Sequence, residues 1–102
     1  MNVEVHEVEV RDNAAEKRFE AWIDDELCGV AEYRLRPGAI VFTHTEVRVE
    51  GKGVGSALAR QALDAVRADG ELRVVPLCPF IKEWIDRHPA YQSLVDPSQT
   101  DA

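Results

Sequence analysis

The segment Glu50-Gly51-Lys52-Gly53-Val54-Gly55-Ser56 separates two differently patterned halves of the sequence. Before it, apolar and β-branched residues alternate with polar ones, which is typical of strands. After it, apolar residues repeat at helical spacing up to Asp69, and Gly70 stands where a helix should end. Three glycines at alternate positions between a strand and a helix indicate a tight turn. They would also leave backbone N–H groups unobstructed at the positive end of the helix, as an anion site requires.

Four strands are expected before the glycine turn and one after it. We predict strands at 3–10, 17–23, 28–35, 39–49 and 71–75, the first four joined by short turns into an antiparallel meander. A right-handed crossover through the helix would place the fifth strand parallel to the fourth. A last helix should begin at Pro79 and end at His88-Pro89, with Phe80, Ile81 and Trp84 on its core stripe. The sequence therefore predicts an α+β fold with a mixed sheet, in the order ββββαβα.

The length and net charge of the chain limit the classes of protein to which it can belong. With 102 residues the chain has room for one domain, placed at 1–95, and the polar tail at 96–102 is expected to fray. Lys and Arg number 12 against 19 Asp and Glu, and the resulting charge of −7 disfavours nucleic-acid and membrane roles while attracting cationic amines. Without a signal peptide or an apolar span, a cytoplasmic location is expected. The scattered Cys and His residues predict no metal site.

The glycine spacing excludes two common phosphate motifs. A P-loop fails because Lys52 precedes Gly53, and G-x-G-x-x-G fails because the spacing here is G-x-G-x-G. The segment instead resembles [QR]-x-x-G-x-[GA], the acetyl-coenzyme A (acetyl-CoA) pyrophosphate loop of GNAT-superfamily N-acetyltransferases. Glu50 departs from that pattern at its first position and is expected to face solvent. A minimal single-domain subgroup is similar also at His44-Thr45-Glu46-Val47, Pro76-Leu77-Cys78 and Arg87-His88-Pro89-Ala90-Tyr91-Gln92-Ser93-Leu94.

The resemblance implies a reduced GNAT-like fold that takes acetyl-CoA as cosubstrate, without a metal, and transfers acetyl to an amine. The pantetheine arm of acetyl-CoA would lie between the strands at 39–49 and 72–75. There it would pair with backbone groups as an added strand does. A peptide or protein lysine is the acceptor that fits best, because a tight turn joins the first two strands and leaves the acceptor side open. The implied cofactor-binding residues are Val47, Val49, Lys52, Gly53, Val54, Gly55 and Ser56.

Three residues are candidates for catalysis. Cys78 precedes a helix whose positive end favours a thiolate, and in the resembling subgroup this cysteine lies near the cofactor's sulfur. The alternative for Cys78 is a small buried hydrophobe. Cys28, in mid-strand with no helix beside it, is interpreted as filler in the core or on the surface. His44 and Glu46 share a strand face if no bulge intervenes, and either could be the general base. If neither is catalytic, His44 is a hydrogen-bonded, half-buried histidine and Glu46 is a solvated charge on the strand.

Other classes of function remain open at this point. A non-catalytic coenzyme A-binding or partner-binding module would use the same glycine loop, and a purely structural scaffold would leave its three glycines without a purpose. Trp22 should point away from the core face of its strand, where it could contact a second subunit. A monomer or a weak homodimer is therefore expected.

Overall fold

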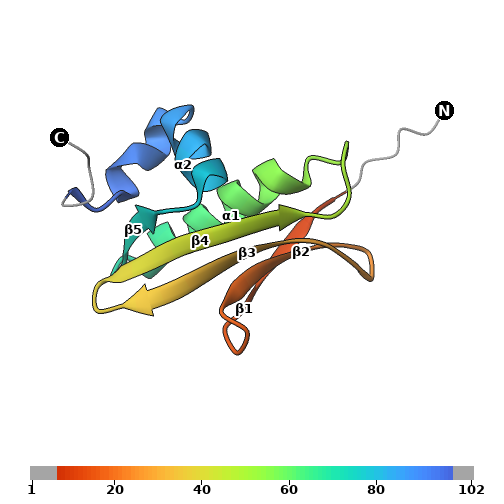
Figure 1. Cartoon of the computed structure of the whole chain (residues 1–102), viewed down its shortest axis with the longest axis horizontal. Coiled ribbons are helices and arrows are strands. Elements are labelled where there is room, and N and C mark those ends of the chain that lie inside the picture. The colour runs from red at the N-terminus through yellow and green to blue at the C-terminus, as the bar shows by residue number, and fades with distance from the viewer. Residues whose placement is uncertain (1–6, 98–102) are drawn as a thin grey trace.

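The computed structural model describes residues 7–97 (Figure 1). Its elements are β1 (Glu9–Asn13), β2 (Arg18–Ile23), β3 (Glu26–Arg36), β4 (Ala39–Val47), α1 (Val54–Asp69), β5 (Arg73–Pro76), α2 (Pro79–Asp86) and the short 3₁₀ helix η1 (Pro89–Leu94). The predicted α+β fold and the order ββββαβα are confirmed. The 3₁₀ helix was not indicated by the sequence.

The five strands form one mixed sheet in the order β1-β2-β3-β4-β5. Strands β1 to β4 are antiparallel neighbours, and β5 runs parallel to β4, as the crossover through α1 predicts. Helices α1 and α2 contribute to the same core on one face of the sheet (Figure 1). Within residues 7–97, no helix covers the opposite face, which we call the helix-free face.

The core lies between α1 and the sheet. Helix α1 turns one apolar stripe toward the strands, formed by Val54, Leu58, Ala59, Ala62, Leu63 and Val66. Against it lies an aromatic cluster of Phe19, Tyr33 and Phe42, with ring centroids 5.4 to 6.4 Å apart. Gly70 ends the helix in a left-handed conformation, as predicted.

Gly29 on β3 allows the first turn of α1 to touch the sheet. A Cβ at this position would lie 2.9 Å from the Glu46 carbonyl oxygen and 2.9 Å from Val54 Cγ1. Both distances are shorter than real Cβ contacts, so any side chain here would push the helix away from the strands. The start of α1, where the glycine loop ends, is thus held close to β3, next to β4.

The first hairpin differs from the prediction. The sequence places a turn at Asp12-Asn13, but β1 continues through both residues and the turn follows at 14–17. Asp12 accepts a hydrogen bond of 2.6 Å from the Tyr33 hydroxyl, and Asn13 donates one of 2.9 Å to Glu20. These partners, distant in sequence or across the hairpin, hold both residues in the strand. Part of the predicted first strand lies outside the described residues.

Trp22 lies on the helix-free face, as predicted, and is half-buried there. Its indole N–H donates to the buried Glu20 carboxylate at 3.2 Å, and the Arg11 guanidinium lies 5.3 Å from its ring centroid. Burial alone would raise the pKa of Glu20, but hydrogen bonds from Asn13, Arg18 and Trp22 outweigh it and hold this pKa below its usual value. Trp22 is therefore part of a polar network on the sheet.

Strand β4 contains a bulge at Thr43. Tyr33 pairs with Phe42 and Glu32 pairs with His44, so Thr43 has no partner on β3. The Thr43 hydroxyl donates to the Glu32 carbonyl oxygen at 3.3 Å, which fixes the extra residue in place. The bulge shifts the alternation of side chains in the rest of β4, which decides how the candidate site is built.

Candidate active site

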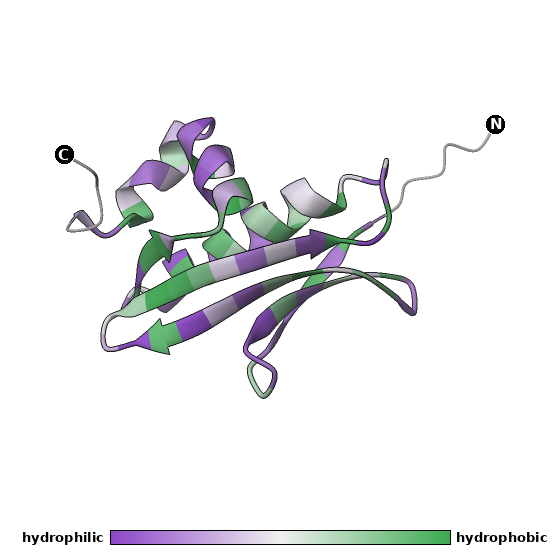
Figure 2. Ribbon diagram, viewed as in Figure 1, coloured by the Kyte–Doolittle hydropathy of each residue, from purple (hydrophilic) through white to green (hydrophobic). Residues whose placement is uncertain are grey.

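Strands β4 and β5 part halfway along β4. They pair only over Ala39–Phe42, and the Cys78 N–H then donates to the Phe42 carbonyl at 2.9 Å before the chain turns into α2. From Thr43 to Val47, β4 keeps β3 on one side and, in the described part of the chain, has no strand on the other. This edge offers backbone N–H and C=O groups with which an extended ligand can pair. Figure 2 shows the same division, with apolar residues in the paired half of β4 and more polar ones beyond it.

The glycine loop reaches the start of α1 beside this opening. Gly51 and Gly53 have φ of 81° and 73°, and no atom lies within 4 Å of the place where a Cβ would stand at either. Gly53 is the N-cap of α1, so the first amides of the helix, at residues 54–56, have no partner within it. Open, left-handed backbone and free amides at a positive helix end fit a phosphate group.

Several predicted cofactor-binding residues can offer only their backbone. The side chain of Val54 is buried, and those of Val47 and Val49 pack half-buried against the core. Glu50 and Lys52 are exposed, and the placement of Glu50 agrees with the prediction. The loop therefore meets a ligand mainly with main-chain groups.

Phe80 rests against the start of α1 rather than in the core. We expected it on the core stripe of the last helix, yet it is 38% exposed, whereas Ile81 and Trp84 are buried. A Cβ on Gly55 would lie 2.9 Å from Phe80 Cζ and 3.4 Å from Val47 Cγ2. Because Gly55 has no side chain, the Phe80 ring finds room where α1, β4 and α2 meet. It forms one wall of the opening.

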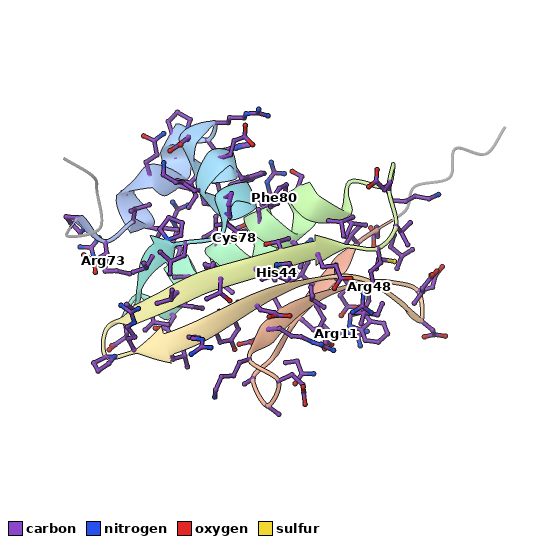
Figure 3. The ribbon with its side chains drawn as sticks, in the orientation of Figure 1. Arg11, His44, Arg48, Arg73, Cys78 and Phe80 are labelled. Carbon is purple, nitrogen blue, oxygen red and sulfur yellow. The ribbon has the colours of Figure 1, made fainter. Side chains whose placement is uncertain are left out.

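Cys78 is the N-cap of α2 and points toward β4 (Figure 3). Its Sγ lies 3.2 Å from Thr45 Oγ1, and the residue is 3% exposed. The thiol makes no capping hydrogen bond with its own helix. Cys28, by contrast, is buried in the core with its Sγ 3.4 Å from the Glu26 carbonyl oxygen, so of the two predicted alternatives the core is the one observed.

The three candidate catalytic residues do not form one cluster. After the bulge, Thr45 faces Cys78, while His44 and Glu46 are exposed on the helix-free face. His44 and Glu46 therefore share a face, as predicted, but Cys78 lies on the other side of β4. Glu46 Oε1 is 3.6 Å from Arg48 Nη2, both side chains being well exposed. Base and thiol could thus meet a reacting group only from opposite sides of the strand edge.

Sequence reasoning missed Thr45 and Phe80 as residues of the site. Thr45 stands in the same motif as His44, but regular alternation along an unbulged strand gives no reason to prefer it. Phe80 follows Cys78 by two residues, and its apolar character suggested the core. The signal that could have found it is Gly55, since a glycine inside a helix indicates a close neighbour.

Two absences can be stated for residues 7–97. No group of three or more His, Cys, Asp or Glu side chains is arranged to hold a metal ion. None of the helices in this part is long and apolar enough to cross a membrane.

Comparison with known proteins agrees with this geometry. The family described as GCN5-related N-acetyl-transferase matches residues 18–94, well over half of the chain. The chain therefore belongs to the GCN5-related N-acetyltransferase family, and this membership supports acetyl transfer as its general activity. A search of curated proteins found no match.

Proposed function

We propose that this protein binds acetyl-CoA along the free edge of β4 and transfers its acetyl group to an amine. The observation that carries the proposal is the parting of β4 and β5 after Phe42, with the glycine loop and Cys78 beside the same opening. Amides of residues 53–56 would hold the pyrophosphate, and the β4 edge would pair with the pantetheine arm. When bound, acetyl-CoA supplies an activated thioester.

The chain's own residues would act from two sides of β4. Cys78, whose Sγ lies opposite Thr45, would accept the acetyl group from acetyl-CoA as the coenzyme A thiol leaves, or would line the reacting end of the opening. His44 and Glu46, which are exposed on the helix-free face, would take a proton from an ammonium donor, directly or through water. The charge of −7 favours a cationic acceptor such as a lysine side chain.

Calorimetric titration with acetyl-CoA, coenzyme A and ATP tests cofactor binding. We expect affinities of micromolar order for the first two and no heat with ATP. Gly53→Val should abolish binding, because a side chain would enter the cradle. Gly38→Val is the matched control, since Gly38 has φ of 74° and equally open surroundings in the turn between β3 and β4. Absence of heat with acetyl-CoA and coenzyme A would refute the proposal.

A second assay tests transfer. Incubation with acetyl-CoA and a lysine-containing peptide, followed by mass spectrometry, should show acetylated peptide. Cys78→Ala should lower the rate while leaving acetyl-CoA binding intact, and Cys28→Ala is the control for losing a buried thiol. Full activity of Cys78→Ala would show that this cysteine only packs against its neighbours and takes no part in transfer.

The helix-free face favours one other function, a non-catalytic coenzyme A-binding module. Within residues 7–97, no helix covers the helix-free face of β4, from which an acceptor amine would approach. A small acceptor would therefore be held poorly. Tight acetyl-CoA binding with no transfer to any amine, in peptides or in folded proteins, would favour this module over the enzyme.

A further inference from the structure

We propose that Thr45 is a positioning residue for acetyl transfer, whose hydroxyl orients the Cys78 sulfur toward β4 and donates a hydrogen bond to it while it reacts. This inference rests on the proposed function, because it concerns the same site. Thr45 acts through Cys78 alone and needs no contact between its hydroxyl and acetyl-CoA or the amine.

The backbone of Cys78 is held at both ends, whereas its side chain has a single polar contact. Its N–H donates to the Phe42 carbonyl at 2.9 Å, and its carbonyl accepts a hydrogen bond of 3.0 Å from the Lys82 N–H. The thiol does not cap α2, and within residues 7–97 its hydrogen-bond partner is Thr45 Oγ1 at 3.2 Å. Since the main chain fixes the Cα, the contact with Thr45 decides where the sulfur points.

The bulge at Thr43 brings the Thr45 hydroxyl to this sulfur. Val47, the next residue on the same side of β4, packs an apolar side chain against the core. A valine at position 45 would fill similar space, and a neutral thiol packs as a small hydrophobe that needs no partner. A half-buried hydroxyl aimed at the thiol is therefore better explained by charge that develops on the sulfur than by packing.

The chemistry of transfer gives the hydroxyl its role. A cysteine attacks a thioester as the thiolate. In the step, the Cys78 sulfur bonds to the acetyl carbon, the bond from that carbon to the coenzyme A sulfur breaks, and the proton lost by Cys78 leaves on the coenzyme A thiol. Thr45 keeps its own proton and donates a hydrogen bond to the negative sulfur, in the same direction as the positive end of α2.

The Thr45→Val variant tests this role, because it removes the hydroxyl and keeps the branched shape of the side chain. We expect the rate at saturating acetyl-CoA to fall about tenfold, as loss of a hydrogen bond to a charged group allows, with unchanged affinity for acetyl-CoA. Thr45→Ser keeps the hydroxyl and should retain most of the rate. In a Cys78→Ala background, Thr45→Val should cause no further loss, because Thr45 acts only through the sulfur.

Alkylation by iodoacetamide measures the effect on the thiol without a transfer assay. Peptide mapping by mass spectrometry follows Cys78 and Cys28 separately. Thr45→Val should slow alkylation of Cys78 about tenfold, because the thiolate is the reacting form, and Thr45→Ser should not. Cys28, whose partner is the Glu26 carbonyl, is the internal control and should react equally in all three proteins.

The outcomes separate this inference from the proposed function. An undiminished rate in Thr45→Val, an equal loss in the Cys78→Ala background, or unchanged or faster alkylation of Cys78 would overturn the role of Thr45 while acetyl-CoA binding stands. Failure of the wild type to bind acetyl-CoA would overturn the proposed function, and the inference with it. Circular dichroism of each variant verifies that the fold is retained.

Discussion

Replacing Gly29 with alanine should destabilise the protein and displace the start of α1. The added methyl carbon would lie 2.9 Å from the Glu46 carbonyl oxygen, 2.9 Å from Val54 Cγ1 and 3.1 Å from Leu58 Cδ1. The first atom belongs to the sheet backbone and the other two to buried helix residues, so none can move aside freely. Overpacking of this kind costs about 1–3 kcal/mol, and the rigid neighbours place Gly29→Ala near the upper end.

For a domain of this size, a loss of about 3 kcal/mol lowers the melting temperature by about 12–15 °C. Thermal unfolding followed by circular dichroism measures the shift, and urea unfolding gives the free energy independently. Gly38→Ala is the control, because its surroundings are open and it should lose only about 1 kcal/mol from its left-handed backbone. A Gly29→Ala variant that melts within about 2 °C of the wild type would refute the close contact between α1 and the sheet.

Three further substitutions test other contacts. Glu20→Gln should cost about 1–3 kcal/mol at pH 7. Because the folded pKa of Glu20 is lowered, the stabilisation is present above the usual value of 4.5 and lost as pH falls through the folded pKa, so melting curves of the two proteins should converge in acid. Tyr33→Phe should cost about 1 kcal/mol in urea unfolding. Burial and Asp12 raise the pKa of Tyr33 well above its usual value of 10, so the wild-type advantage should shrink as pH rises past 10, and a constant difference would contradict this. Ser56→Ala should cost about 1 kcal/mol and alter tryptophan fluorescence, because the Trp84 indole N–H loses its acceptor at 3.2 Å; unchanged emission would argue against that bond.

The order of elements could be predicted because most local signals agree with the final fold. Alternation in β2 and β3, the helical period after Val54 and the stop at Gly70 each reflect the same core. The turn of the first hairpin was predicted at the wrong residues, because Asp12-Asn13, taken in isolation, is a typical turn sequence. Tyr33 gives Asp12 a partner that no local pattern could reveal.

The candidate site was predicted in part. The glycine loop could be located because Gly51, Gly53 and Gly55 stand at alternate positions directly before the helical pattern, where they leave the backbone unobstructed. The separation of Cys78 from His44 and Glu46 could not, because the run from Ala39 to Val47 is compatible with a strand at every position. The bulge exists only in the pairing with β3, which sequence alone does not contain.

The extra residue at Thr43 is equivalent to a frame shift in the two-residue repeat of a strand. Deleting Thr43 would restore a continuous repeat, because His44 would follow Phe42 directly and residues 44–47 would keep their faces and their partners on β3. A regular strand that kept Thr43 would instead exchange inside for outside over residues 44–47, so that Glu46 entered the core without a partner and Thr45 turned away from Cys78. This half of β4 can therefore lose the one extra residue, but it cannot be straightened while it keeps it.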